Sequence, residues 1–528
     1  MSLNRRNFLH LGITGSALLL ANTNMGAKNF VGEFDIEERT IAELQEAMKR
    51  GDITSKALVE IYLKRIKDID PLIASIIEIN PDAVKIAEEM DSERAGGKIR
   101  SGLHGIPFVI KDNIDTADKM KTTAGSLALI EAPTPKKDAF IVSKLRAAGA
   151  VLLAKTNLSE WANFRSQNAS SGWSGRGGQT RNPYILDRSP CGSSSGSGAA
   201  VSANLAAIAL GTETDGSIVC PASINGIVGI KPTLGLVSRS GIIPIAHSQD
   251  TAGPMARTVS DAATLLNAIV GKDPDDSVTA QFDELSKLDY TQFLDANSLN
   301  GARLGVMRQY FGKNAELDGL MNSLLTKMKA AGAELIDVDF PDLRNYGDDE
   351  YQVLLYEFKN DLNKYLAARG GKYDTLKKLI AFNYANAEKE LPYFKQEIFV
   401  EAQAKDGLES REYRLALLRS KVLTQDKGID LLIGNYRLDA LIAPSNAQSW
   451  MIDLINGDSP TNYVSSSSIA AVSGYPNITV PSGFLDKLPI GVSFFGSAFS
   501  EPKLISLAFA WEQKIKARKK PTFLPTFK

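Results

Sequence analysis

The chain has 528 residues, of which 44% are hydrophobic and 23% charged, and its net charge is −1. These values are typical of a globular protein, and they argue against a disordered chain and against charge-driven binding to nucleic acid or an anionic membrane. Only two cysteines occur, without metal-ligand spacing, which excludes a disulfide-rich scaffold and a cysteine-based metal site.

The first 27 residues have the pattern of an export signal. Residues 4–10 read Asn-Arg-Arg-Asn-Phe-Leu-His, a twin-arginine pattern, and the apolar run Leu11–Ala21 follows it. This run is too short to cross a bilayer stably. We therefore expect export by the twin-arginine route to the periplasm, no stable membrane anchor, and a folded domain over residues 28–528.

Two amphipathic helices are expected at the start of that domain, the first with Thr40 as its cap. Their apolar stripes recur at helical spacing and consist of Ile41, Leu44 and Met48 in the first helix and Leu58, Ile61, Tyr62 and Ile66 in the second.

Between residues 105 and 270 short apolar runs alternate with helical segments. The strand-like runs are Ile106–Ile110, Val151–Ala154 and Ile227–Ile230, and the helical segments include Ala139–Ala148 and Ala199–Leu210. This alternation predicts an α/β sheet with crossover helices, which forms the core of the domain.

Residues 280–435 are more charged and helical in pattern, which predicts a helical insertion that could serve as a lid. Strand-like runs return at Asp439–Pro444, Ile478–Pro481 and Ile490–Phe495, and a last helix is expected from near Ser500 to Lys516. No long Pro/Gly linker separates these parts, so we expect a single domain with an insertion.

Two Ser- and Gly-rich turns are the clearest candidates for chemistry. They lie at Pro190–Gly198 and Gly211–Ser223. Turns with so few side chains bring backbone N–H groups close to a ligand, and a serine in them becomes a nucleophile if a base is near. The chain has three histidines, and one of them, His10, lies in the signal segment, so lysine is the leading candidate for the base. We interpret Cys191 and Cys220, which flank these turns, as packing residues rather than a bridge.

Two other serine patterns in the chain match known nucleophile motifs. Residues 192–196 fit the G-x-S-x-G nucleophile elbow, which would make Ser194 the nucleophile with Asp215 or Asp250 and His247 as partners. An elbow needs a strand directly before it, and residues 188–191 make a poor strand. Residues 500–503 fit S-x-x-K, but a serine followed by Glu-Pro is typical of a helix start.

A lysine base must be buried, because burial disfavours the ammonium form and lowers its pKa from about 10.4. Three lysines directly follow apolar strand-like runs: Lys111, Lys155 and Lys231. The residues alone do not choose among them.

Several segments together resemble the amidase signature family. They are Gly-Ser-Ser-Ser-Gly-Ser at 192–197, Gly-Thr-Glu-Thr-Asp-Gly-Ser-Ile-Val-Cys-Pro-Ala at 211–222, Gly-Ile-Lys-Pro-Thr-Leu-Gly at 229–235, His-Gly-Ile-Pro-Phe-Val-Ile-Lys-Asp-Asn at 104–113 and Lys-Thr-Asn-Leu-Ser-Glu at 155–160. The resemblance covers about residues 35–520. Asp215 and Val219 depart from the broad family pattern, and with the segments at 171–184 and 248–253 they resemble bacterial peptide amidases. The resemblance implies an α/β/α sandwich with a large mixed central sheet covered by helices.

The resemblance also implies a Ser–cis-Ser–Lys triad. Its lysine falls on Lys111, its cis-serine on Ser193 and its nucleophile on Ser217, which leaves Lys155 and Lys231 with structural roles. The tetrahedral oxyanion would then be bound by backbone N–H groups of the tight turn Thr214, Asp215, Gly216 and Ser217. Candidate substrate contacts are Ser194, Trp173 and Asp250.

The expected activity is therefore hydrolysis of carboxamides with release of ammonia, with C-terminal amides of peptides as substrates. Small aryl or alkyl amides or esters are the alternative substrates, and a non-catalytic binding protein on the same fold is the alternative outside enzymes. We expect no metal, no cofactor, no nucleic-acid partner and a monomer.

Overall fold

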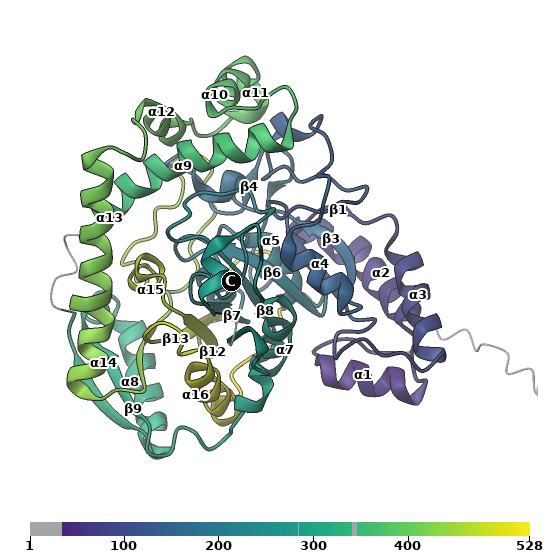
Figure 1. Ribbon diagram of the computed structural model, residues 1–528. Coiled ribbons are helices and arrows are strands. Elements are labelled where there is room, and N and C mark those ends of the chain that lie inside the picture. The colour runs from purple at the N-terminus through teal and green to yellow at the C-terminus, as the bar shows by residue number, and fades with distance from the viewer. Residues whose placement is uncertain (1–33, 283–284, 341–345, 528) are drawn as a thin grey trace, which may run out of the picture.

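The computed structural model describes residues 34–282, 285–340 and 346–527. A mixed sheet of 11 strands forms its centre, and helices surround the sheet (Figure 1), which confirms the predicted fold class. Across the sheet the strands lie in the order β1 (Ile76–Ile79), β3 (Val151–Thr156), β2 (Pro107–Lys111), β6 (Ile208–Glu213), β8 (Thr251–Ala256), β7 (Val228–Lys231), β12 (Asn477–Leu485), β13 (Leu488–Phe495), β11 (Ala440–Pro444), β9 (Arg303–Met307) and β10 (Glu334–Val338). The short strands β4 (Trp173–Ser174) and β5 (Gly178–Gln179) form a separate pair.

The helices follow one another along the chain as α1 (Ile41–Arg50), α2 (Ser55–Ile73), α3 (Ala83–Ala95), α4 (Phe140–Ala147), α5 (Ser195–Ser202), α6 (Val219–Ile224), α7 (Val259–Ile269), α8 (Ala315–Ala330), α9 (Gly347–Arg369), α10 (Leu376–Ala385), α11 (Ala387–Glu390), α12 (Glu397–Ala404), α13 (Arg411–Thr424), α14 (Asp430–Tyr436), α15 (Ser468–Ser473) and α16 (Glu501–Ile515). Thr40 caps α1 as predicted, because its side chain accepts a hydrogen bond from the Glu43 N–H. In the described residues no helix has both the length and the apolar character needed to span a membrane.

The parallel strands β3, β2 and β6 position the site. Phe108 in the middle strand lies opposite Leu152 and Ile208, so these strands run side by side in the same direction. All their residues are buried, as expected for a sheet covered on both faces. Their carboxyl ends therefore meet at one edge of the sheet, where Lys111 ends β2.

The strand-like runs are confirmed as β2, β3, β7, β11, β12 and β13, and α16 begins after Ser500 as predicted. One helical prediction was wrong in its second half. Only the first part of Ala199–Leu210 is helical, since α5 ends at Ser202, Asn204 adopts a positive φ of 58°, and Ile208 begins β6. Buried small residues fit either structure, so their periodicity could not separate them.

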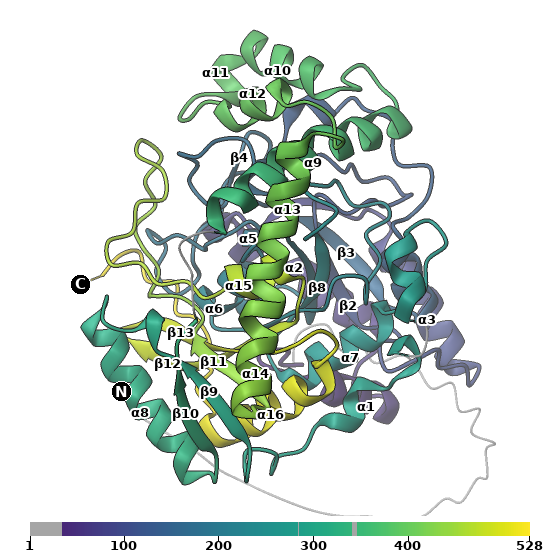
Figure 2. The ribbon, with the colours of Figure 1, turned by 60° about the vertical axis from the view of Figure 1, so that its left-hand side comes forward.

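Residues 280–435 contain helices, as their mostly helical pattern predicted, together with two strands, β9 and β10, which extend one end of the central sheet. The helices that follow them form a layer over one side of the molecule, with α10, α11 and α12 at its end and α13 along its face (Figure 2). Phe358 of α9 and Phe399 of α12 share an apolar cluster with Trp161, Ile243 and Ile245 of the core. The helical layer thus packs on the segment that lines the cavity described below.

The twin-arginine pattern and the apolar run after it lie outside the described residues.

Candidate active site

Lys111 is fully buried at the carboxyl end of β2. Its Nζ lies 2.7 Å from Ser193 Oγ, 2.9 Å from Thr212 Oγ1 and 3.1 Å from the Thr212 carbonyl oxygen. Burial lowers the pKa of Lys111 to about 7, although the charges of Asp250 and Glu213 act to raise it. A large fraction of this lysine is therefore neutral near pH 7 and able to accept a proton.

Ser193 lies in the turn that precedes α5. The Gly192–Ser193 peptide bond is cis. A Cβ atom at Gly192 would collide with Ser159 Oγ, so the turn favours glycine at this position. The Ser159 N–H also donates to the Ser193 carbonyl at 3.1 Å, which fixes the turn against the end of β3.

Ser217 lies in the loop between β6 and α6. The Glu213 side chain links the two ends of this loop. Its carboxylate accepts hydrogen bonds from the N–H groups of Ile218 at 2.7 Å and Val219 at 3.0 Å. The Ser194 N–H donates to the Ser217 carbonyl at 3.1 Å. The two serine turns are thus joined directly, although 24 positions separate the two predicted catalytic serines in the sequence.

The backbone of the loop offers hydrogen-bond donors. Within the residues that the structure describes, no N–H group of Thr214–Ser217 has a hydrogen-bond partner in the protein. The Asp215 side chain is held elsewhere, since it accepts hydrogen bonds from Ser467 at 2.7 Å and Ser468 at 2.6 Å. Donors without an internal partner are what an oxyanion-binding loop requires.

Three polar residues that the sequence analysis gave no role hold the site together. Thr212 contacts Lys111, and Asn113 Nδ2 donates to Thr212 Oγ1 at 3.0 Å. Glu213 closes the serine loop as described. Their positions in the sequence, at or just after the ends of strand-like runs, could have indicated that they lie near the site. Because β2 and β6 are parallel, the carboxyl ends of these two strands meet.

The other two candidate lysines have no contact with either serine turn among the described hydrogen bonds. Lys155 donates to the Ile114 carbonyl and, at 3.0 Å, to Thr122 Oγ1. Lys231 donates to the Pro232 carbonyl at 3.2 Å, and burial lowers the pKa of Lys231 to about 8. Their contacts are those of structural lysines.

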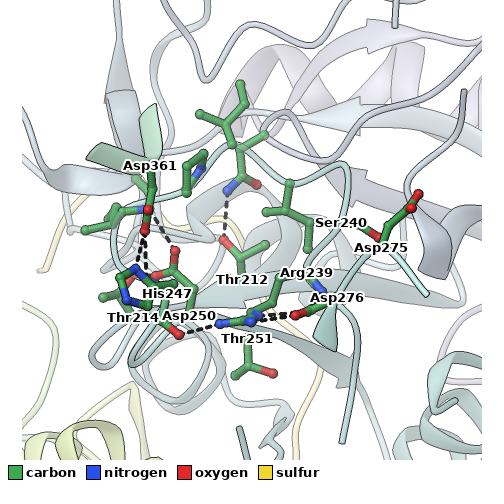
Figure 3. A pocket seen from close by; sticks show the side chains of 16 residues that line it. Thr212, Thr214, Arg239, Ser240, His247, Asp250, Thr251, Asp275, Asp276 and Asp361 are labelled. Carbon is green, nitrogen blue, oxygen red and sulfur yellow. Dashed lines mark hydrogen bonds and ion pairs between the residues drawn. The ribbon is translucent and has the colours of Figure 1, made fainter. Parts of the chain in front are cut away.

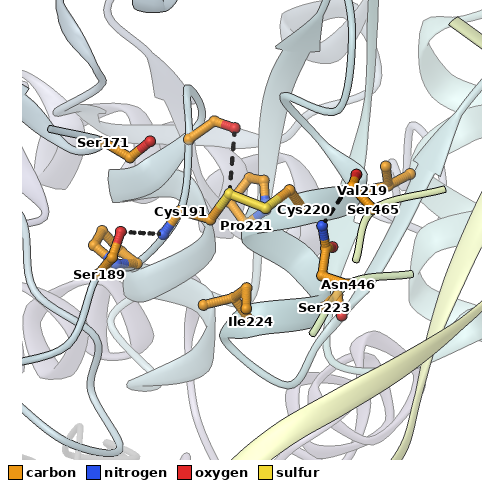
Figure 4. The surroundings of a disulfide bond; sticks show 12 residues. Ser171, Ser189, Cys191, Val219, Cys220, Pro221, Ser223, Ile224, Asn446 and Ser465 are labelled. Atoms are coloured by element: carbon orange, nitrogen blue, oxygen red, sulfur yellow. Dashed lines mark hydrogen bonds between the residues drawn. A yellow bond between two sulfur atoms is a disulfide. The ribbon is translucent and has the colours of Figure 1, made fainter. Parts of the chain in front are cut away.

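The prediction that Cys191 and Cys220 are unbridged was wrong, because they form a disulfide with a Cα–Cα distance of 6.0 Å (Figure 4). Cys191 lies two residues before Ser193, and Cys220 lies three residues after Ser217. Trp450 packs against the bridge and Ile224. A low cysteine count excludes a framework of many bridges but says nothing about one pair, and proximity across 29 residues becomes visible only in the fold.

The predicted substrate contacts lie in three different environments. Ser194 is fully buried, and its hydroxyl lies 3.1 Å from the carbonyl oxygen and 3.2 Å from the nitrogen of Thr212. Trp173 packs edge-to-face against Tyr393 and Phe394, away from the cavity. Asp250 lies at the cavity, where it accepts a 2.5 Å hydrogen bond from Thr214 Oγ1.

The elbow alternative finds no support in this geometry. No strand directly precedes Ser194, whose hydroxyl is bonded to the Thr212 backbone. His247 lies instead beside α9, with its Nδ1 2.7 Å from Asp361 and its Nε2 3.4 Å from Glu357. These three side chains could hold a metal ion by distance, but they already satisfy one another. The S-x-x-K pattern is also structural, because Lys503 pairs with Asp439 at 3.0 Å.

A cavity of about 190 Å³ opens beside the site (Figure 3). Thr212, which contacts Lys111, lines this cavity together with Thr214 and Asn113. Apolar residues form a second wall, and charged residues surround the rest. The apolar wall consists of Ala162, Ile242, Ile243, Pro244 and Ile245, and the charged residues are Arg239, His247, Asp250, Asp275, Asp276 and Asp361.

Comparison with known proteins assigns this arrangement to a family. The family model described as Amidase matches residues 57–505. The chain belongs to the amidase family. A probable amidase from Arabidopsis thaliana is 42% identical over 97% of both chains.

Solved structures give a closer likeness. The native peptide amidase of Stenotrophomonas maltophilia is 49% identical, with a TM-score of 0.88 over 92% of this chain and 99% of that one. A structure of peptide amidase in complex with the competitive inhibitor chymostatin has the same identity and coverage and a TM-score of 0.90. The chain is thus an amidase that resembles peptide amidase over nearly its whole length.

Proposed function

We propose that this amidase hydrolyses the C-terminal amides of peptides through a relay of Lys111, Ser193 and Ser217. The observation that carries the proposal is the buried Lys111, 2.7 Å from Ser193 in a turn that is bonded to the Ser217 loop. Burial keeps much of this lysine neutral near pH 7, and a neutral amine is the form that a general base requires.

The relay begins with proton transfer. Neutral Lys111 takes the proton of the Ser193 hydroxyl, Ser193 takes the proton of the Ser217 hydroxyl, and the Ser217 oxygen attacks the amide carbon. The C–N bond then breaks, the relay returns a proton to the nitrogen, and ammonia leaves. Water enters by the same route, adds to the acyl-enzyme and releases the carboxylic acid and Ser217.

Negative charge develops on the carbonyl oxygen during each addition. The N–H groups of Thr214, Asp215, Gly216 and Ser217 are the donors that we assign to it. They have no partner in the described protein, and Glu213 fixes the loop that carries them. Donors held in place before the reaction stabilise the transition state without reorganisation.

The peptide substrate is proposed from the likeness to peptide amidase, at 49% identity and a TM-score of 0.88. The cavity of about 190 Å³ beside Lys111 supports this substrate. That space fits one side chain of a peptide.

The test is ammonia release from an N-acetylated, C-terminally amidated dipeptide. Wild type should release ammonia, and Ser217→Ala, Ser193→Ala and Lys111→Ala should each lower the rate by at least about 10³-fold. Lys155→Met is the matched control, because it removes a buried lysine outside the relay and should retain turnover. If wild type cleaves small aryl amides or esters and leaves peptide amides intact, the relay stands and the peptide substrate is wrong.

We also propose export to the periplasm by the twin-arginine route. The pattern at residues 4–10 and the Cys191–Cys220 disulfide support this proposal, because disulfides persist in oxidising compartments. Replacement of Arg5 and Arg6 by lysine should retain the protein in the cytoplasm, as cell fractionation would measure. Equal periplasmic amounts of variant and wild type would refute this route.

A further inference from the structure

The apolar wall of the cavity is held rigidly beside the site. The Ile243 N–H donates to the Asn113 carbonyl at 2.8 Å, and Asn113 follows Lys111 by two residues. The Ile245 N–H donates to Asp250 at 2.8 Å. Both isoleucines also pack in the cluster that includes Phe358 and Phe399 of the helical layer. The wall is therefore fixed from two sides and offers an apolar surface of defined shape.

The charges around the cavity are unbalanced. Four aspartates line it, against one arginine and one histidine. Arg239 is already paired, since it donates to Asp276 at 2.6 Å and 2.9 Å (Figure 3). His247 is paired with Asp361 at 2.7 Å. Among the described residues that line the cavity, no cation remains to receive another carboxylate.

One carboxylate at the cavity, that of Asp250, makes no ion pair among the described residues and is held by neutral donors instead. Asp250 is held by Thr214 Oγ1 at 2.5 Å and by the N–H groups of Ile245 and Ala246 at 2.8 Å and 2.9 Å. Asp275 stands at the exposed rim and pairs with Lys137, which is itself 78% exposed and well hydrated. A second anion entering this space would meet carboxylates, while the arginine and histidine of the lining are already paired, and desolvated like-charge contacts of this kind disfavour binding.

We propose that this cavity receives the side chain of the residue whose carboxamide is hydrolysed, and that it accepts apolar and cationic side chains and rejects carboxylates. The inference rests on the proposed function, because it assigns the cavity to the amidated residue of a peptide. The apolar wall accounts for acceptance of apolar chains, and the paired cations account for rejection of acidic ones.

The test uses N-acetyl dipeptide amides that differ only in the amidated residue, which is glycine, leucine, lysine, glutamine or glutamate. Glutamine is the uncharged match of glutamate. We expect kcat/KM at pH 8 to be at least roughly ten-fold lower for the glutamate amide than for the glutamine amide, and higher for leucine and lysine than for glycine.

Two variants locate the effect in the cavity. Ile243→Ala should lower the leucine-to-glycine ratio of kcat/KM several-fold. Asp275→Lys adds a cation at the rim and should raise the glutamate-to-glutamine ratio several-fold, whereas the same charge change at Asp68, an exposed residue of α2, should leave that ratio unchanged.

The outcomes separate the two proposals. Hydrolysis of all five amides with equal kcat/KM, or ratios that neither variant changes, would overturn the side-chain assignment and leave the proposed function standing. No ammonia from any of the five amides, from a preparation that cleaves a small aryl amide, would overturn the peptide substrate itself.

Discussion

The Cys191–Cys220 disulfide gives the sharpest quantitative prediction. It closes a loop with a sequence separation of 29 residues. The loop-closure relation assigns such a bridge about 3.6 kcal/mol of stability at 25 °C, through the entropy that it removes from the unfolded chain. With an unfolding entropy of about 2.1 cal/mol/K per residue, a chain of this length should lose about 3 °C in Tm when the bridge is removed.

The assay measures Tm by calorimetry and kcat by ammonia release. The samples are untreated wild type, the variant Cys191→Ser/Cys220→Ser, and both proteins after treatment with a reductant. Reduction of wild type is complete when thiol titration finds two free thiols. Reduction should lower Tm by about 3 °C in wild type and leave the variant unchanged. Because the bridge acts on the unfolded state and the Ser194 N–H still bonds the Ser217 carbonyl, kcat should stay within about two-fold. An unchanged Tm after verified reduction would refute the loop-closure reasoning, and a large loss of kcat at constant Tm would show that the bridge acts on the folded site instead.

Three further predictions follow from the charges and contacts of the site. Activity of wild type should rise with pH through about 7, because Lys111 must lose its proton to act as a base, and a flat rate from pH 5 to 9 would contradict a lysine base. Asp250→Asn should move this rise to lower pH, since the Asp250 charge raises the pKa of Lys111; kcat/KM profiles would measure the shift, and a move to higher pH would be the wrong sign. Lys155→Met should lower stability by about 1–3 kcal/mol, because the buried Ile114 carbonyl and Thr122 hydroxyl lose their donor while Asp112 and Asp115 keep Arg176 and Arg369 nearby, and denaturant unfolding with a midpoint equal to that of wild type would contradict this role.

Much of the central sheet could be predicted because its strands are short apolar runs that end in polar residues. Lys111, Lys155 and Lys231 each lie at or near a strand end, as their runs suggested. Choosing among them needed the fold, because only the pairing of β2 with β6 brings Thr212 and the serine turns to Lys111. The family resemblance selected the same lysine from its motif.

What the sequence could not reveal depends on contacts between distant segments. The pairing of β9 and β10 with the rest of the sheet is set by tertiary packing, and local helical pattern in the surrounding residues concealed it. The partners of His247 come from α9, more than 100 positions away. The burial of Trp173 against Tyr393 and Phe394 is a contact of the same kind.

The most direct test of the relay is the site of reaction with a fluorophosphonate probe, which modifies an activated serine. Labelling from pH 6 to 9 followed by peptide mapping should place the adduct on Ser217, with a rate that rises through about pH 7 and is lost in Lys111→Ala. An adduct on Ser194, or labelling of Ser217 that does not depend on Lys111, would contradict the account.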